Sequence, residues 1–344
     1  MKRTIIIGDI HGCYDELLEL LDVAAVASED LVVSVGDLVD RGPDPGDVVR
    51  WFRARPGAVV LMGNHERKHV RETFSYSQDV TRVQLGDAYA DCVEWMRGLP
   101  YYYETPEIRV VHAAVMPGVP LAEQSEDVLC GSVSGEAKLR AAIPEAWWHE
   151  RYTDEVPIAF GHHVTGPEPL LRDGKIYGLD TGACHGGRLT ALSVPDFRLY
   201  SVAARADHWR ECARRYQVPV LRTRPWPTMS WGKIDDTIAE RREDAAPDTV
   251  AYLATLAEWV ASIRALVPVL LAQVPVIAER LRAEHGEAGF AAAATAHPAK
   301  PLLFLHGRNR LALDAIEARC ATPAATLALA AKLGVEASTI AAAP

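Results

Sequence analysis

The sequence has no excess of positive charge, no close pair of cysteines and no long unbroken apolar run. Its 344 residues carry 36 Lys and Arg against 46 Asp and Glu, a net charge of −10. A protein that binds nucleic acid over a broad surface usually carries a basic face, so we expect no extensive surface of that kind. A nucleotide or phosphoprotein substrate stays open, because local charge decides it. Hydrophobic residues make up 49% and charged residues 24%, which predicts one large or two ordinary globular domains and not a disordered chain.

The cysteines and the apolar segments indicate in which cellular compartment the protein is expected. The 6 cysteines lie far apart, and none belongs to a CxxC pair. We therefore expect neither a secreted disulfide framework nor a zinc ribbon. We expect the thiols to be reduced. The N-terminal apolar run, 5–7, is too short for the core of a signal peptide. The most apolar later stretch, 260–278, is interrupted by Arg264, Pro268, Gln273 and Pro275. We expect no membrane span and a soluble cytoplasmic protein.

Three short apolar segments near the N-terminus each end in Gly followed by Asp or Asn. They span 4–7, 31–35 and 58–62, and helix-like apolar spacing follows the first two over 14–26 and 47–55. Alternating strands and helices predict a parallel sheet with helices on its faces. Ligands of such sheets bind beyond the carboxyl ends of the strands, where these Gly-Asp and Gly-Asn pairs fall.

Later strands are expected to complete this sheet or to pack a second sheet on it. After a helix over 79–97, the expected strands are 101–104, 109–113, 157–160, 175–179, 189–194 and 199–202. An insertion, 114–156, separates two of them.

The character of the sequence changes after Ala204. The expected elements are a helix over 205–216, an extended Pro- and Trp-containing stretch over 218–232, a helical region over 249–284 bent or split at Pro268 and Pro275, and an Ala-rich end over 288–344. The end is interpreted either as packed helices or as a partly ordered tail. Pro and Trp fix a chain against a surface at little cost, so we expect Arg224–Pro227 to clasp the preceding domain; a docking strand is the alternative.

Five short segments place Asp, Asn or His directly after an apolar strand. They are Gly8–Gly12, Gly36–Gly42, Gly63–Glu66, Val111–Ala113 and Gly161–His163. A single Asp there usually caps a helix, but five strand ends that all carry metal-capable side chains are improbable as caps. Imidazole and carboxylate together favour Mn, Fe, Zn or Ni over Ca or Mg. Two such ions roughly 3.5–4 Å apart can hold the attacking and leaving oxygens of a displacement at phosphorus.

These segments resemble the signature of the calcineurin-like metallophosphoesterase superfamily. More narrowly they resemble its phosphoprotein-phosphatase family, whose pattern is GDxHG, GDxVDRG, GNHE and two later His. The segment 178–192 is similar to the closing strand of that family, and the resemblance covers residues 3–203. It implies a four-layer α/β/β/α sandwich over 1–204, followed by a mainly helical C-terminal extension, 205–344. Dimerisation, partner binding and covering of the active site are the roles left open for the extension.

The resemblance also implies a set of metal ligands. Asp9 and His11 would bind a first ion, Asp37 would bridge both ions, and Asn64, His112 and His162 would bind the second. His163 is the weaker ligand candidate. Mn²⁺ is the first expectation for the two divalent ions, with Fe, Zn or Ni as alternatives.

For catalysis, the resemblance implies a water or hydroxide between the ions as the nucleophile. His65 would protonate the leaving oxygen, and Asp40 would orient His65. Arg41 would hold phosphate oxygens with its planar fork of N–H donors.

Three departures from the eukaryotic pattern point to the bacterial branch of the family. Met62 stands where Arg usually precedes GNHE, and Ala113 and Ala114 stand where Gly-Gly usually follows His. The insertion resembles that of bacterial relatives, in which a second phosphate-binding Arg lies just ahead of an aromatic pair. Here the pair is Trp147 and Trp148, the preceding residues are Ile-Pro-Glu-Ala, and the nearest substitutes are Arg140 and Arg151.

The sequence therefore predicts a two-metal phosphatase acting on phosphate monoesters, with phospho-Ser/Thr protein as the first choice of substrate. A dinucleoside tetraphosphate and a 2′,3′-phosphate at a nucleic-acid end are the alternatives. Trp147 and Trp148 would stack a base, line a peptide groove or lie in the core. A partner-binding scaffold with a dead site is the non-enzymatic alternative, and the intact set of acids, amide and imidazoles argues against it.

Overall fold

The computed structural model describes residues 3–242, 245–337 and 340–344, and the chain forms two compact units, 1–216 and 217–344. The sequence places the domain limit at residue 204. In the structure the helix α8 (His208–Arg215) also lies within the first unit.

The first sheet of the N-terminal unit has the strand order β11-β10-β1-β2-β3. Its strands are β1 (Thr4–Ile7), β2 (Leu31–Ser34), β3 (Val59–Val60), β10 (Arg188–Val194) and β11 (Leu199–Ala203), and β9 (Asp180–Thr181) pairs with β10. The strands β1, β2 and β3 are parallel, as the alternation of strands and helices predicts. Both faces of β1 are buried, because Ile5 and Ile7 point to one side and Ile6 to the other.

A second sheet packs on the first. Its order is β4 (Tyr102–Glu104), β5 (Arg109–Val111), β6 (Ile158–Phe160), β8 (Ile176–Gly178) and β7 (Leu170–Arg172). Ile6 and Val33 of the first sheet share one hydrophobic cluster with Val110 and Ala159 of the second. The interface between the sheets is therefore an apolar layer.

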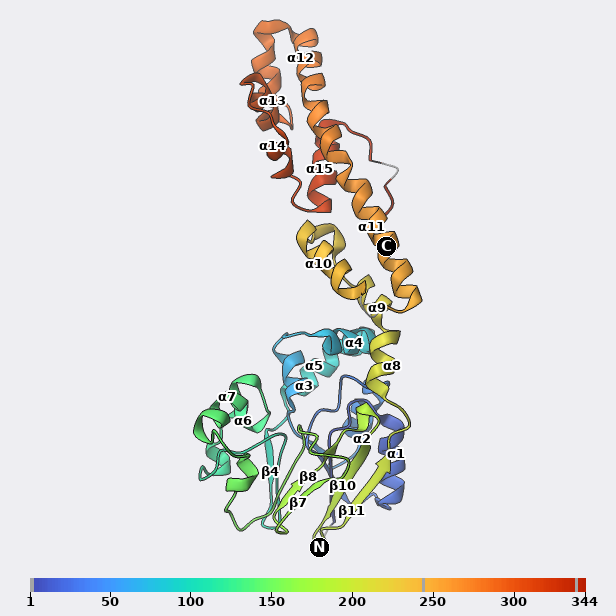
Figure 1. Cartoon of the computed structure of the whole chain (residues 1–344), viewed down its shortest axis with the longest axis vertical. Helices are drawn as coiled ribbons and strands as arrows, with labels where there is room; N and C mark the ends of the chain where they lie inside the picture. Colours follow the sequence, from blue (N-terminus) through green and yellow to red (C-terminus); the bar gives the residue numbers. More distant parts are fainter. Residues whose placement is uncertain (1–2, 243–244, 338–339) are drawn as a thin grey trace. The chain divides into compact units, whose positions relative to one another are not determined.

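Helices cover the two outer faces, and Figure 1 shows them on opposite sides of the paired sheets. On the first sheet lie α1 (Tyr14–Val23), α2 (Pro45–Ala54) and α5 (Tyr89–Arg97), which share a cluster with Ile5 and Ile7. On the second lie α6 (Glu126–Leu129), α7 (Val133–Ala142) and η3 (Trp148–Arg151). Buried residues of α6 and η3 and the partly buried Leu139 of α7 pack with Val111 and Phe160. The predicted four-layer α/β/β/α sandwich is confirmed.

Several elements differ from those expected. The helix expected over 79–97 is two helices, α4 (Tyr76–Leu85) and α5, separated by the short turn η1 (Gly86–Ala88), because Gly86 has φ 50° and ends α4. A helix, α3 (Asn64–Val70), starts directly after β3, and the strands β7 and β9 were not expected either. These elements are too short for a periodic signal in the sequence.

The helix α8 is held on α1 by a buried carboxylate. Glu16 is 1% exposed and accepts hydrogen bonds from His208 Nε2 at 2.8 Å and from the Arg205 N–H at 2.9 Å. Burial alone would raise the pKa of Glu16, but these hydrogen bonds lower it to about 2. The hydrogen bond to Glu16 raises the pKa of His208 above its ordinary value.

This pair predicts a pH-dependent contribution to stability. A raised His208 pKa gives stability that is complete below the unfolded value of about 6.5 and is lost as pH rises through the folded value. A lowered Glu16 pKa gives stability that is lost only as pH falls toward about 2. His208→Gln keeps a neutral donor at the Nε2 position, so it should lower the free energy of unfolding by about 1 kcal/mol near pH 5.5 and by little near pH 9 in urea denaturation. An equal loss at both pH values would contradict the charged-pair account.

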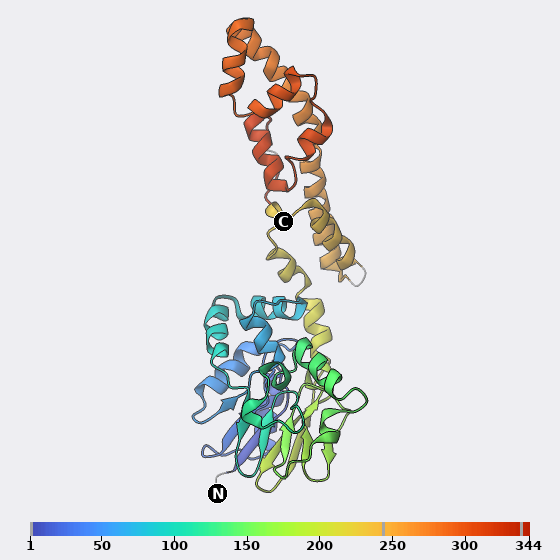
Figure 2. The ribbon, with the colours of Figure 1, turned by 90° about the vertical axis from the view of Figure 1, so that its left-hand side faces the viewer.

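The described residues of the C-terminal unit form helices joined by loops, with no strand among them. Its helices are α9 (Gln217–Arg222), α10 (Trp231–Arg242), α11 (Pro247–Arg264), α12 (Leu266–Ala296), α13 (Lys300–Gly307), α14 (Leu313–Glu317) and α15 (Pro323–Leu333), with the short turn η5 (Trp226–Thr228). The helices α13, α14 and α15 pack on α12 (Figure 2). Of the two alternatives for the Ala-rich end, packed helices is the one observed.

The Pro- and Trp-containing stretch 218–232 is not extended, because α9 covers its first residues and η5 lies within it. Trp226 is 1% exposed in a cluster with Leu253 and Leu256 of α11, and its Nε1–H donates to the Tyr252 hydroxyl at 2.9 Å. The predicted clasp over the catalytic domain is therefore wrong: Trp226 belongs to the core of the C-terminal unit.

The helical region that follows breaks one turn before Pro268. This proline has no N–H to donate to the Arg264 carbonyl, and α11 ends at Arg264. Pro275 lies inside α12, and an unpredicted interruption occurs at Gly286, where φ is 67°. Within the described residues, one helical stretch, Pro247–Ala296, is long and apolar enough to cross a membrane by length and composition alone. Its buried side chains belong to two hydrophobic clusters of the C-terminal unit, and 28% of its most apolar window is buried.

Candidate metal centre

The predicted ligands come from five strand ends at one edge of the two sheets. Asp9, Asp37 and Asn64 follow β1, β2 and β3 of the first sheet, and His112 and His162 follow β5 and β6 of the second. Since β1, β2 and β3 are parallel neighbours, their carboxyl ends bring the first three side chains together. The second sheet brings the imidazoles to the same edge.

The backbone at this edge is strained. Five of the predicted site residues have positive φ angles: His11 47°, Asp37 52°, Asp40 69°, Arg41 68° and His162 69°. Left-handed conformations cost free energy for residues with a Cβ, and they cluster where function requires a fixed geometry.

Two glycines let the backbone approach the carboxylates. A Cβ on Gly63 would lie 2.1 Å from Asp37 Oδ1, and one on Gly161 would lie 1.9 Å from Asp9 Oδ1. Any larger residue at these positions would displace a predicted ligand.

Asp37 lies at the middle of the cluster. Its Oδ2 is 3.6 Å from His11 Nε2, and its Oδ1 is 3.5 Å from His112 Nε2. Its Oδ1 also accepts the backbone N–H of His65 at 3.0 Å. Asp37 thereby belongs to two groups of side chains with ligand atoms within 4.8 Å of one another, His11–Asp37–His65 and Asp37–His112–His162. This is the position that the resemblance assigns to a bridging ligand.

On one side of Asp37, unprotonated acceptor atoms face one another. The Nδ1–H of His112 donates to the Val35 carbonyl at 3.1 Å, so His112 Nε2 carries a lone pair, and it points at Asn64 Oδ1 3.0 Å away. Likewise, Nε2–H of His162 donates to Glu136 Oε1 at 3.1 Å, and His162 Nδ1 points at the same Asn64 oxygen at 3.1 Å. Converging acceptors of this kind fit a cation.

On the other side of Asp37, His11 likewise presents a ring nitrogen with a free lone pair. The Nδ1–H of His11 donates to the Val39 carbonyl at 2.8 Å, which leaves His11 Nε2 as an acceptor next to Asp37 and the Arg41 guanidinium. Burial, and then the Arg41 charge, lower the pKa of His11, so the ring is neutral. Burial, and then the carboxylates of Asp180 and Asp37, raise the pKa of Asp9 well above its usual range.

The donor set therefore fits two divalent ions. It offers neutral imidazole, carboxylate and amide oxygen, the mixture typical of Mn, Fe, Zn or Ni sites. Bound there, such ions would act as Lewis acids toward a phosphoryl oxygen and lower the pKa of water.

Next to this cluster, Asp40 holds His65 in place. Asp40 is fully buried and accepts hydrogen bonds from His65 Nδ1 at 2.6 Å, from His69 Nε2 at 2.9 Å, from Thr81 Oγ1 at 2.6 Å and from Gln78 Nε2. Burial alone would raise the pKa of Asp40, but the hydrogen bonds from His65 and His69 lower it well below its usual range. The ionised carboxylate fixes the His65 ring with Nε2 3.9 Å from Asp37 Oδ2.

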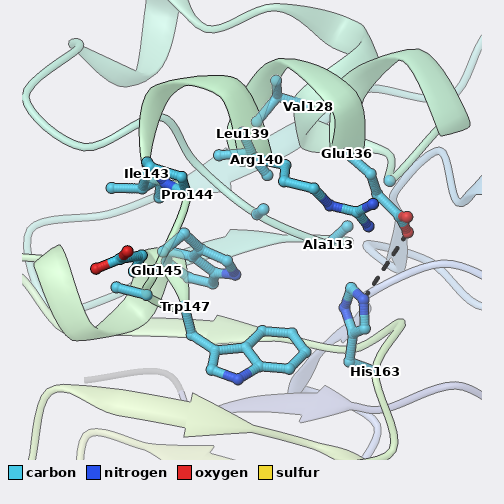
Figure 3. Close-up of a pocket in the computed structure, with 14 residues that line it drawn as sticks. Ala113, Val128, Glu136, Leu139, Arg140, Ile143, Pro144, Glu145, Trp147 and His163 are labelled. Carbon is cyan, nitrogen blue, oxygen red and sulfur yellow. Dashed lines mark ion pairs between the residues drawn. The ribbon is translucent and has the colours of Figure 1, made fainter.

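A cavity of about 460 Å³ adjoins the metal cluster (Figure 3). Ala113 and Ala114, which follow His112, and His163, which follows His162, form part of its wall. Glu136 also lines it, and Glu136 is hydrogen-bonded to His162. The wall is mostly apolar, with Ala113, Ala114, Val128, Leu139, Ile143, Pro144, Ala146, Trp147 and Trp148 among its residues.

The three arginines predicted to bind phosphate lie in different places. Arg41 lies beside His11, with Nη1 3.1 Å from His11 Nε2. Arg140, on α7, lines the cavity, and Figure 3 shows its guanidinium extending toward Ala113 and Glu136. Arg151 is exposed at the end of η3 and does not line the cavity. His163 is 3.8 Å from Glu136 and lies outside both groups that contain Asp37.

Several residues of the cluster have no role predicted from the sequence. Asp180 is 6% exposed in β9, close enough to Asp9 for its charge to raise the pKa of that carboxyl. The Glu66 carboxylate accepts the backbone N–H groups of Asp37 and Leu38, each at 2.8 Å, and so shapes the loop after β2. Two signals were available for Asp180: it directly follows the expected strand 175–179, and it lies in the segment 178–192 that resembles the family's closing strand. For Glu136 and Gln78 the sequence holds no such signal.

A paired-sheet sandwich that gathers acids, an amide and imidazoles at one strand-end edge defines a binuclear metallohydrolase. The family model of the calcineurin-like phosphoesterases matches residues 2–200, more than half of the chain. The chain belongs to this family, and it is a hydrolase of phosphate esters. The family uses two divalent metal ions. The C-terminal unit lies outside the matched residues.

Curated relatives are similar over nearly their whole length. A bis(5′-nucleosyl)-tetraphosphatase PrpE, asymmetrical, of Halalkalibacterium halodurans is 30% identical over 231 residues, covering 58% of this chain and 93% of the relative. A symmetrical bis(5′-nucleosyl)-tetraphosphatase of Yersinia enterocolitica is 28% identical over 267 residues, covering 58% and 91%. A solved structure described as a candidate diadenosine tetraphosphatase has a TM-score of 0.50 at 28% identity, covering 59% of this chain and 94% of the other.

Proposed function

We propose that the chain hydrolyses bis(5′-nucleosyl) tetraphosphates at a two-metal centre. The observation that carries the proposal is the apolar cavity of about 460 Å³ beside the metal cluster, since a nucleotide needs room for its nucleoside next to its phosphates. The similarity to bis(5′-nucleosyl)-tetraphosphatases supports the same substrate class. A bis(5′-nucleosyl) tetraphosphate therefore replaces phospho-Ser/Thr protein, the first choice from the sequence, as the proposed substrate.

In this proposal the side chains divide between metal binding and substrate binding. Asp9, His11, Asp37, Asn64, His112 and His162 hold two divalent ions, with Mn²⁺ as the first choice. Arg41, beside His11, binds phosphate oxygens close to the ions. Arg140, on the cavity wall, binds phosphates farther along the chain of the substrate. The exposed position of Arg151 gives it no part in this arrangement.

His65 and Asp40 supply the proton. Asp40 accepts from His65 Nδ1–H, which turns His65 Nε2 toward the cluster, where it can donate a proton to the oxygen that leaves phosphorus. The four hydrogen bonds to Asp40 keep this orientation before substrate arrives.

A substrate panel tests the proposal. The Mn²⁺-loaded protein should hydrolyse diadenosine tetraphosphate with a kcat/KM at least about tenfold above those for a phosphoserine peptide, p-nitrophenyl phosphate and a 2′,3′-cyclic nucleotide, a difference of about 1.4 kcal/mol in transition-state binding. Chromatography of the products distinguishes two ADP from AMP plus ATP. A higher kcat/KM for the phosphopeptide or for the cyclic phosphate would overturn the nucleotide assignment in favour of that alternative.

A further inference from the structure

Trp147 stands out among the tryptophans of the chain. It is 55% exposed, and the other seven are buried or half-buried. An indole left this open to water is uncommon, because tryptophan is highly buried on average. Trp147 also lines the cavity beside the metal cluster. A ligand in the cavity could therefore contact this exposed indole.

The Trp147 indole contacts two histidine rings and also lines the cavity. The His149 ring lies nearly parallel to it, at 5.9 Å and 14°, and His149 does not line the cavity. The His163 ring meets it edge-on at 5.4 Å and 80°. These two contacts fix the orientation of an otherwise exposed ring, and a rigid flat surface is what stacking requires.

The opposite wall is apolar. Leu139, Ile143 and Pro144 line the cavity, and Figure 3 shows them across the space from Trp147. Between an indole and aliphatic side chains, a flat heteroaromatic ring loses water on both faces. A nucleobase has this shape, and stacking tolerates any base because each has a π-face.

The charged side chains of the cavity indicate where the phosphates of a bound nucleotide would lie. Arg140 extends toward Ala113 and Glu136, at the end of the cavity next to the metal cluster. Glu136 is engaged with His162, so its carboxylate is oriented by the metal centre. A nucleotide whose base lies on Trp147 would then direct its phosphates past Arg140 to the ions.

We propose that this cavity is a nucleobase subsite, with Trp147 as the stacking platform and Arg140 as the group that receives the adjoining phosphate. The inference rests on the proposed function, because it assumes that the substrate is a nucleotide. It adds that the base itself, and not only the phosphates, is recognised.

Competition between matched inhibitors tests the subsite without using a nucleotide substrate. Hydrolysis of p-nitrophenyl phosphate by the full-length Mn²⁺-loaded protein is inhibited with adenosine 5′-(α,β-methylene)diphosphate and, separately, with methylenediphosphonate, which lacks the nucleoside. In the wild type the nucleoside compound should bind at least about tenfold more tightly, within the range of base–aromatic stacking. Equal inhibition constants would overturn the proposal.

Variants then assign the difference to Trp147. Trp147→Ala should reduce the ratio of the two inhibition constants at least about fivefold, and Trp147→Phe should keep most of it. Leu171→Ala is the matched control: Leu171 is 53% exposed on β7 and does not line the cavity, so the ratio should equal that of the wild type. A wild-type ratio in Trp147→Ala would assign base recognition elsewhere and overturn the role of Trp147.

The two proposals fail in different ways. If diadenosine tetraphosphate is a poor substrate but the inhibitor ratio depends on Trp147, the subsite stands and the assigned substrate is wrong. If diadenosine tetraphosphate is hydrolysed well and the inhibitor ratio is close to one, the proposed function stands and the subsite is wrong.

Discussion

Asp37→Asn is expected to lower kcat/KM for p-nitrophenyl phosphate by on the order of a thousandfold, the effect of losing several kcal/mol of metal-derived stabilisation of the transition state. The reason is the position of Asp37, whose two oxygens lie 3.6 Å from His11 Nε2 and 3.5 Å from His112 Nε2. One carboxylate thus serves both ligand groups, and the substitution removes a negative charge from between two cations.

The variant should still fold. Its Oδ1 can accept the His65 N–H as Asp37 does, so the loop after β2 keeps its hydrogen bond. Metal content, measured by mass spectrometry of the dialysed protein, should fall together with activity. Asp15→Asn is the matched control, because its side chain is 61% exposed on α1 and its substitution changes the net charge equally. Full metal content with more than about a tenth of the activity would contradict a bridging role.

The first half of the cluster could be predicted from the sequence because its geometry is local. Asp9 and Asp37 each follow a short β-branched strand within a strand–helix unit, and parallel pairing of β1 with β2 brings such strand ends together. No tertiary detail is needed for that inference. His112 and His162 come from the second sheet; the strand-end pattern singled them out as metal-capable, but it was the resemblance that assigned them to one ion with Asp37.

The residues that support the site could not be predicted in this way. Gln78 and Thr81 reach Asp40 from α4, and Glu136 reaches His162 from α7. Each contact depends on how a helix packs over a sheet edge, which the sequence of neither helix specifies. The same limit applies to Arg140 and Arg151, which sequence spacing alone could not rank.

In the C-terminal unit, the sequence held a local signal, but the prediction drawn from it was wrong. A local signal was present in Arg224–Pro227, but the partner surface was assigned to the wrong unit. Trp226 packs against Leu253 and Leu256, about thirty residues later in the chain, and donates to Tyr252. Pro and Trp indicate an anchored segment without indicating where the anchor binds.

The largest effect after that of Asp37→Asn is expected for His65, and it should depend on the leaving group. His65→Ala removes the proposed proton donor, a contribution typically of about 10²–10⁴ in rate. The loss should be largest for phenyl phosphate, whose phenolate is basic, and clearly smaller for p-nitrophenyl phosphate, whose phenolate leaves without a proton. Steady-state kinetics with the two substrates at constant Mn²⁺ measures the difference.

This comparison separates proton donation from mere support of the cluster. His65 Nε2 is 3.9 Å from Asp37 Oδ2, so a collapse of the site would slow both substrates by the same factor. Asp40→Asn, which removes the charged acceptor of the His65 Nδ1–H, should follow the same order of substrates with a smaller loss. His285→Ala, in the C-terminal unit and outside the family match, is the histidine control and should leave both rates unchanged. Equal losses for the two phosphates in His65→Ala, or no loss in either, would remove His65 as the general acid, because only a group that transfers a proton to the departing oxygen makes the rate depend on the basicity of that oxygen.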